Sequence, residues 1–287
     1  MKRLKLMTLL AASLSTHLAV WAGQVHVLDL SSGEIRQVTL DDRLSCGSPH
    51  WSPDGDRIAY DAWQGDGAAN NTDIYVVPRE GGGPKRLGPG MIPAWSSDGS
   101  MIFFSRMGGT STPTAVFAMN ADGSGRESLL EGGFFPRVVD DHTYTAMFNM
   151  DLVRHDVVAD RISHLNLGYF IAPGYSYSSI KNRYLVVSMP WNLRVVSYNE
   201  ALSSWETQVL LSSKRRIGQV SWASDGRRAV VAMGDPKKDC SLYVIDVEDG
   251  TAPKPVAGLP PDWICCNPNW SPTRDEIVFV RVDPDKP

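Results

Sequence analysis

The sequence predicts an all-β fold, a six-bladed β-propeller that is closed by its N-terminal strands. A phrase of the type Trp-Ser-Pro-Asp-Gly, the Trp phrase, recurs in varied form at Trp51, Trp95, Trp222 and Trp270. The first two tryptophans are 44 residues apart and the last two are 48 apart. The 127 residues between Trp95 and Trp222 have room for two degenerate copies at a period of about 42, which is typical of propeller blades.

Residues 1–22 are predicted to be a secretory signal peptide, and residues 23–287 a single propeller domain. Three basic residues within the first five positions precede an apolar run, and cleavage is expected near Ala22–Gly23. A transmembrane anchor is the alternative, but the run is short and contains Ser, Thr and His residues. We therefore expect a periplasmic or secreted protein with no membrane span after cleavage.

The charge of the mature chain argues against a nucleic-acid partner. Of the 28 Lys and Arg residues, 25 remain after cleavage against 32 Asp and Glu residues, so the formal net charge is −7. Phosphate binding requires a clustered basic face, and the sequence contains none.

The turn within the Trp phrase explains why a strand pair surrounds it. Pro presets the backbone φ, Asp bonds to its own backbone, and Gly accepts a positive φ. In the first copy this turn connects predicted strands 49–51 and 57–61, and a Gly-rich turn at 80–83 connects strands 73–77 and 85–87. The tryptophan is interpreted as a core residue that packs between neighbouring blades.

The next four copies follow the same strand order. The second is predicted at 92–95, 101–106, 115–120 and 126–130, and the degenerate third at 136–139, 143–148, 151–156 and 162–165. The fourth has lost the Trp phrase and keeps strands 184–188, 194–198 and 207–211. The fifth is clear, at 219–222, 228–233, 241–247 and 254–256. An error of one blade in the count would lie in the third and fourth copies.

The incomplete sixth copy predicts how the ring closes. It contains only strands 268–270 and 276–281, without an outer pair. Residues 24–30 and 34–40 form an unassigned strand pair at the mature N-terminus. Pairing of these segments with the last blade would leave few exposed strand edges, so we expect the N-terminal strands to complete that blade.

Two segments of the repeat closely resemble those of TolB-type propellers. They read Pro-His-Trp-Ser-Pro-Asp-Gly-Asp-Arg-Ile-Ala-Tyr at 49–60 and Val-Phe-Ala-Met-Asn-Ala-Asp-Gly-Ser-Gly at 116–125. The resemblance covers essentially the whole mature chain and implies a six-bladed propeller of the cell envelope, where TolB acts in the Tol–Pal system. The same repeat forms the non-catalytic propeller of prolyl-oligopeptidase-like enzymes. No hydrolase domain is expected here, and Gly-Tyr-Ser-Tyr-Ser at 174–178 lacks the closing glycine of a nucleophile elbow.

The face opposite the Trp phrases is predicted to carry the binding site, because the irregular loops gather there. These loops lie at 61–72, 106–114 and 168–179. Aromatic side chains on this face could stack on sugars or anchor apolar groups of a partner, or they could plug the channel and pack the blade connections. The predicted binding residues are Trp63, Tyr169, Tyr175, Tyr177, Trp191 and Trp263, with His50, Arg137 and Asn269 from the inner strands.

A metal site is only weakly indicated. His50 could be a metal ligand or a general base, but the other mature histidines fall in predicted outer strands or turns, so a structural role is favoured. Asp66, Asn70, Asn71 and Asp73 suggest a Ca²⁺ loop, but the regular ligand spacing is missing. No catalytic residue, metal ligand or other cofactor is predicted, and Ca²⁺ is left as the one alternative.

The four cysteines are predicted to form two disulfides, because an exported chain meets oxidising conditions. Cys46, Cys240, Cys265 and Cys266 fall on one face by strand order. A bond between the adjacent Cys265 and Cys266 would be strained, so Cys46 is expected to pair with one of them and Cys240 with the other. A thiolate metal site that includes His50 is the alternative.

The predicted function is non-catalytic binding of an envelope protein or glycan. The alternative is a hydrolase, lyase or lactonase with a metal-assisted site at the channel mouth. Convergence of three or more His, Asp or Glu side chains at the mouth would favour the enzyme, and an aromatic mouth without that cluster would favour binding. The sequence predicts neither the ligand nor the oligomeric state.

Overall fold

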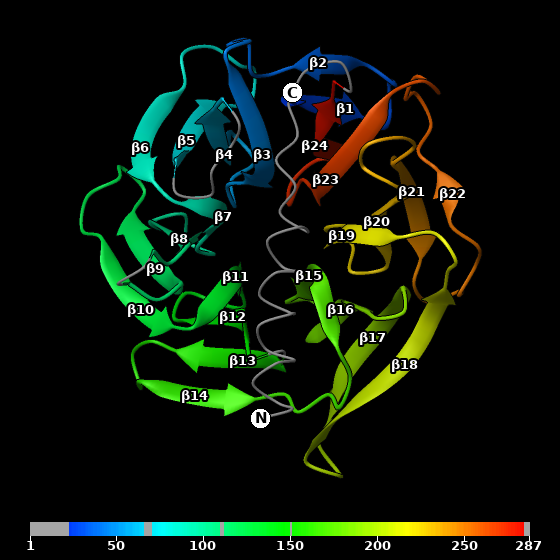
Figure 1. Ribbon diagram of the computed structural model, residues 1–287. Helices are drawn as coiled ribbons and strands as arrows, with labels where there is room; N and C mark the ends of the chain where they lie inside the picture. The colour runs from blue at the N-terminus through cyan, green and yellow to red at the C-terminus, as the bar shows by residue number, and fades with distance from the viewer. Residues whose placement is uncertain (1–22, 66–70, 110–111, 150, 284–287) are drawn as a thin grey trace.

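Six antiparallel sheets of four strands radiate from a central axis in the computed structural model, as Figure 1 shows. The structure describes residues 23–65, 71–109, 112–149 and 151–283, and every regular element within these ranges is a β-strand. The fold is therefore the predicted six-bladed β-propeller. The predicted signal peptide lies outside the described residues, and no helix that could span a bilayer occurs among those described.

Five blades are formed by consecutive strands, from the channel outward. Blade 1 contains β3 (Leu44–Trp51), β4 (Arg57–Gln64), β5 (Thr72–Pro78) and β6 (Lys85–Pro89). Blade 2 contains β7 (Met91–Trp95), β8 (Met101–Arg106), β9 (Ala115–Asn120) and β10 (Glu127–Glu131). Blade 3 contains β11 (Gly133–Val138), β12 (Thr143–Phe148), β13 (Asp151–Asp156) and β14 (Arg161–His164). Blade 4 contains β15 (Ile171–Ser178), β16 (Arg183–Ser188), β17 (Asn192–Asn199) and β18 (Ser204–Ser212), and blade 5 contains β19 (Ile217–Trp222), β20 (Arg228–Met233), β21 (Ser241–Asp246) and β22 (Lys254–Pro255).

Blade 6 joins the two ends of the chain, as predicted. Its inner strands are β23 (Ile264–Trp270) and β24 (Glu276–Val282), and its outer strands are β1 (Gly23–Asp29) and β2 (Ile35–Gln37). Strand β1 pairs with β24 along its whole length, from Gly23 opposite Val282 to Asp29 opposite Glu276. This pairing closes the ring and covers the outer edge of β24.

The recurring tryptophans lie buried between blades, which confirms their interpretation as core residues. Three of them lie under an arginine from the preceding blade, at distances from guanidinium carbon to ring centroid of 4.5 Å (Arg57 over Trp95), 4.8 Å (Arg183 over Trp222) and 5.0 Å (Arg228 over Trp270). Each arginine opens the second strand of its blade. The contact therefore links adjacent blades through cation–π attraction as well as burial.

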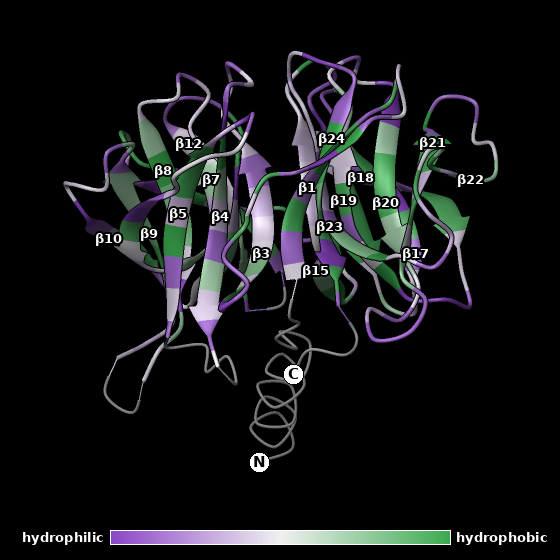
Figure 2. Cartoon of the chain, turned by 90° about the horizontal axis from the view of Figure 1, so that it is seen from above, coloured by the Kyte–Doolittle hydropathy of each residue, from purple (hydrophilic) through white to green (hydrophobic). Residues whose placement is uncertain are grey.

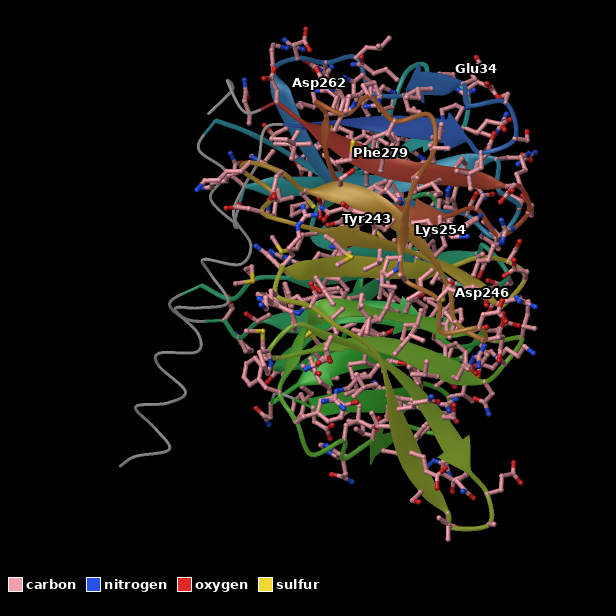
Figure 3. The ribbon with its side chains drawn as sticks, turned by 90° about the vertical axis from the view of Figure 1, so that its right-hand side faces the viewer. Glu34, Tyr243, Asp246, Lys254, Asp262 and Phe279 are labelled. Atoms are coloured by element: carbon pink, nitrogen blue, oxygen red, sulfur yellow. The ribbon has the colours of Figure 1, made fainter. Side chains whose placement is uncertain are left out.

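Hydrophobic residues follow the strands, and many of the loops at both ends of the ring are hydrophilic, as the colours of Figure 2 show. In Figure 3, Lys254 on β22 lies at the outer side of the ring. Phe279 on β24 instead belongs to the buried cluster between blades 5 and 6. The core is thus a set of layers between blades, which surrounds the channel.

All six inner strands are interrupted by a bulge at the same place, where the pairing with the second strand shifts register. In four blades the bulge has a residue of positive φ followed by proline: Ser48-Pro49, Ile92-Pro93, Phe135-Pro136 and Asn267-Pro268. One edge of an inner strand faces the channel and has no partner strand. Proline, which has no N–H to donate, is therefore tolerated there.

The tolerance of proline at the inner edge explains why the sequence interpretation of blade 4 was wrong. Residues 168–179 were expected to be a connecting loop, but β15 within them is the inner strand of that blade. Pro173 and Gly174 lie within this strand, where the unpaired inner edge accommodates the proline. Tyr177 pairs with Tyr184 and occupies the place that a Trp phrase gives to tryptophan.

The predicted disulfides are a second correction, because all four cysteines are free and buried. Cys46 packs in the hydrophobic cluster between blades 6 and 1. Cys240, Cys265 and Cys266 pack together in the cluster between blades 5 and 6, where the N–H of Cys265 donates to the carbonyl of Cys240 at 2.9 Å. Burial raises the pKa of the Cys46 and Cys265 thiols to about 12, which disfavours the thiolates that the alternative metal site would require.

Candidate functional site in the central channel

A cavity of about 310 Å³ occupies the end of the channel that the Trp-phrase turns surround. Its wall is formed by the inner strands and by the turns that follow them. Tryptophan rings, serine hydroxyls and two amide side chains, Gln219 and Asn269, make up much of this wall. Arg137 is the only Asp, Glu, Lys or Arg residue among the described residues that line the cavity, and His50 is the only histidine.

The residue before each Trp position forms a ring around the channel, in blade order His50, Ala94, Arg137, Ser176, Ser221 and Asn269. In half of the ring its side-chain oxygen accepts the main-chain N–H of the Trp position in the next blade. Trp222 N donates to Ser176 Oγ at 3.3 Å, Trp270 N to Ser221 Oγ at 3.0 Å, and Trp51 N to Asn269 Oδ1 at 2.9 Å. These bonds join blades 4, 5, 6 and 1 at the channel wall.

His50 occupies this position in blade 1 but forms no such link. Its Nδ1 lies 3.1 Å from the carbonyl oxygen of Trp51, and since a carbonyl only accepts, Nδ1 carries the proton. Burial, together with the nearby charge of Arg137, lowers the pKa of His50 to about 3. The imidazole is therefore neutral at pH 7, and its Nε2 is a hydrogen-bond acceptor.

Arg137 occupies the same position in blade 3. Its Nη1 donates to the carbonyl of Pro136 at 2.8 Å, and the guanidinium lies 4.3 Å from the ring centroid of Phe135. Burial lowers the pKa of Arg137 to about 10, so it stays charged at neutral pH. Among the described residues no carboxylate forms an ion pair with Arg137, although the charge of Asp61 acts on it from a longer distance. A half-buried charge without an ion-pair partner is costly, which is typical of sites that receive a ligand.

Phe135, on which Arg137 stacks, is itself fixed from two sides. Its N–H donates to Ser105 Oγ at 2.9 Å, and its carbonyl accepts the hydroxyl of Tyr175 at 2.5 Å. The hydroxyl of Tyr175 also lies 2.9 Å from the carbonyl oxygen of Thr145, and burial raises the pKa of Tyr175 well above its ordinary value. The arginine therefore rests on a rigid support.

Asp61 is a buried carboxylate one layer away from this ring. Its Oδ2 accepts the N–H of Ile92 in blade 2 at 2.6 Å. Ser105 forms the equivalent bond one blade further on, where its Oγ accepts the N–H of Phe135. Burial raises its pKa to about 6, although the charge of Arg137 favours the ionised form. Asp61 thus links blades 1 and 2 and titrates close to neutrality.

The cavity brings together four of the nine predicted binding residues: His50, Arg137, Tyr177 and Asn269. Trp63 and Tyr175 are buried elsewhere in the blades. The three others are covered by arginines: Arg194 over Tyr169 at 4.5 Å, Arg216 over Trp191 at 5.8 Å and Arg281 over Trp263 at 4.3 Å. Such packing favours the plug interpretation for these three residues. The cavity lies at the opposite end of the channel from the face that the sequence favoured.

Sequence reasoning missed Ser176 and Asp61. Ser176 could have been found from spacing, since Tyr177 precedes Arg183 by six residues, as Trp51 precedes Arg57. For the suggested Ca²⁺ loop, Asp66 and Asn70 lie outside the described residues, and Asp73 binds Arg86 through both oxygens at 2.8 Å. No group of three His, Cys, Asp or Glu side chains that could hold a metal occurs among the residues described.

A second hollow of about 660 Å³ lies between blades 3 and 4, next to the β17–β18 hairpin that projects from the ring in Figures 1 and 3. Tyr198 and Trp205 line it with ring centroids 5.2 Å apart. Trp205 also contacts Tyr184, which contacts Tyr177 at the channel cavity. Arg154, Arg161 and His164 are among the polar residues of its wall.

Comparison with known proteins shows the fold and nothing finer. No protein-family model and no curated protein sequence matches the chain. A putative TolB from Agrobacterium tumefaciens is similar at a TM-score of 0.70 with 17% identity, over 92% of this chain and 99% of that one. TolB from Acinetobacter baumannii gives 0.61 with 13% identity, over 92% and 65%. A puromycin-hydrolyzing peptidase from Mycobacterium tuberculosis gives 0.56 with 17% identity, over 84% and 43%. The chain therefore has a six-bladed β-propeller fold similar to that of the two TolB structures.

Proposed function

We propose that this propeller is exported to the cell envelope and binds, without catalysis, a polypeptide segment of an envelope protein in its channel cavity. The observation that carries the proposal is the cavity wall, where serine hydroxyls, the half-buried Tyr177 and the exposed Ile180 accompany a single arginine. Aromatic rings give contact area at low entropic cost, and the few polar groups give orientation. The two TolB structures and the apolar N-terminal run support the envelope location.

The size of the cavity limits what it can receive. Ligand sites usually measure about 300 to 1,000 Å³. A cavity of about 310 Å³ fits a few side chains of an extended segment and not a folded domain. The bound partner would therefore insert a terminus or a loop into the channel.

Site-specific photocrosslinking in cells that export the full chain tests this proposal. A photoreactive amino acid at Ile180, a turn residue that lines the cavity and is 62% exposed, should yield a defined adduct with an envelope protein. The matched control is Leu202, which is 65% exposed in the β17–β18 hairpin region. Adducts from Leu202 but not from Ile180 would contradict insertion into the channel.

The hollow between blades 3 and 4 favours a second candidate function, binding of a glycan. Exposed Tyr198 and half-buried Trp205 offer ring faces for stacking on sugars, and Arg154, Arg161 and His164 offer hydrogen bonds. Tyr198→Ala should abolish retention on immobilised peptidoglycan or polysaccharide, whereas Tyr243→Ala on blade 5 should not. Equal retention of the two variants would contradict this candidate.

A further inference from the structure

We infer that Arg137 and His50 form a subsite for the C-terminal carboxylate of a polypeptide. The inference rests on the proposed function, because it names the chemistry of the segment that enters the channel. It differs from the proposal in its test, because small carboxylates can probe the subsite without the partner protein.

The charge of the cavity indicates an anion. Arg137 is the only charged side chain among the described lining residues, since His50 is neutral. A guanidinium has five N–H donors, and one nitrogen of Arg137 is engaged, by the carbonyl of Pro136. The free donors match the two oxygens of a carboxylate, which arginine binds in bidentate fashion.

The surroundings of Arg137 are prepared for such a ligand. Phe135 supports the guanidinium from one side and is held by Ser105 and Tyr175. Side-chain order is therefore established before binding, and little further entropy is lost. Hydroxyl groups that could also donate to an anion belong to Ser178, Ser179 and Ser224. Those of Ser96 and Ser97 already donate to the carboxylates of Asp98 and Asp141.

His50 distinguishes a chain terminus from a simple anion. Because Nδ1 carries the proton, Nε2 of His50 is a hydrogen-bond acceptor. This nitrogen has no hydrogen-bond partner among the described residues. A lone pair repels a carboxylate oxygen but accepts an N–H. The terminal residue of a polypeptide presents both groups, a carboxylate for Arg137 and its own amide N–H for His50.

The ring position itself separates these two residues from their equivalents. In blades 4, 5 and 6 the same position is filled by Ser176, Ser221 and Asn269, whose oxygens bond the next blade. In blades 1 and 3 the functional groups make no such bond and remain available in the cavity. His50 and Arg137 thus lie in the half of the ring where this residue forms no hydrogen bond to the next blade, and both can contact a ligand.

Nuclear magnetic resonance of the mature protein tests the inference with three probes: N-acetylglycine, N-acetylglycinamide and acetate. N-acetylglycine should shift the side-chain Nε resonance of Arg137 and the ring nitrogens of His50. Acetate should bind more weakly, and the neutral amide should shift neither. Arg137→Gln should weaken N-acetylglycine binding about tenfold or more, since a hydrogen bond to a charged group is lost.

Three further variants keep the result interpretable. Arg137→Lys retains the charge but not the planar guanidinium that binds a carboxylate in bidentate fashion, so it should bind N-acetylglycine with intermediate affinity. His50→Phe should remove the preference for N-acetylglycine over acetate, and Arg281→Gln, outside the cavity, should change nothing. Equal shifts from the amide and the acid, or unchanged binding by Arg137→Gln, would overturn the inference. Binding of N-acetylglycine without any crosslink from Ile180 would leave the subsite intact and contradict only the proposed partner.

Discussion

An ion pair between Arg79 and the buried Glu276 contributes to the seam between blades 1 and 6, and its removal should be costly. Arg79, which follows β5 in blade 1, binds Glu276 of β24 in blade 6 across 197 residues of sequence. Its Nε lies 2.8 Å from Oε2, and its Nη2 contacts Oε1. The Glu276 side chain is only 3% exposed, so water cannot replace the arginine. Arg79→Met should therefore leave an uncompensated buried carboxylate.

The expected loss of unfolding free energy is about 3–5 kcal/mol, the usual cost of removing one partner of a buried pair. This is a large part of the roughly 5–15 kcal/mol that stabilises a typical domain. Arg43→Met is the matched control, because Arg43 pairs with Asp41 while 80% exposed. An exposed pair contributes about 0–1 kcal/mol. The double variant Arg79→Met, Glu276→Leu should recover most of the loss, since no charge remains buried.

Equilibrium urea unfolding at pH 7, followed by tryptophan fluorescence and far-UV circular dichroism, measures all four proteins. Comparison of midpoints at constant slope separates stability from changes in cooperativity. Two results would refute the reasoning. One is a loss for Arg79→Met no larger than that for Arg43→Met. The other is a double variant as unstable as the single one, which would show that the pair acts through packing and not through charge.

Three further predictions concern closure, core and titration. Deletion of residues 24–40 should abolish cooperative melting, because it removes the strands that cover β24, and a truncated protein that melts like the mature chain would contradict the closure. Trp95→Ala should cost about 3–5 kcal/mol in urea unfolding, and Trp191→Ala, on the covered rim, much less. Asp61 has a folded pKa raised from 3.8 to about 6, so the stabilisation by its protonated form is present below pH 3.8 and lost as the pH rises through about 6. Asp61→Asn should therefore gain about 3 kcal/mol over the wild type between pH 4 and pH 8, and parallel pH profiles would disprove this.

The channel site was only partly predictable, because it depends on contacts between blades. His50, Arg137 and Asn269 were found as the residues before the Trp position, which is a matter of spacing alone. Whether such a residue bonds the next blade or faces the cavity depends on its neighbour, as the bond between Asn269 and Trp51 across 218 residues shows. Spacing along the chain contains no such information.

The aromatic residues illustrate the same limit. Tyr175 and Tyr177 are two positions apart in β15, yet Tyr175 is buried against blade 3 and Tyr177 lines the cavity. The register of β15 is continuous from Tyr175 to Ser178, so both rings lie on the same side of the strand, and they differ in how deeply they lie in the layer between blades 3 and 4. A sequence interpretation that placed both on a loop could not separate them.

By itself the sequence determined the all-β class, the six blades and their closure, because each blade is a meander of consecutive strands whose turns recur with a fixed period. A local sequence pattern is sufficient to predict a blade whose strands pair with their neighbours along the chain. The last blade lacked an outer strand pair, and β1 and β2 were the one pair without a blade, so their position followed. Only the tertiary structure decided that Cys46 lies in a different cluster from the other three cysteines, and which face holds the cavity. These features depend on how neighbouring sheets pack, and packing sets the distances between side chains that the chain itself keeps far apart.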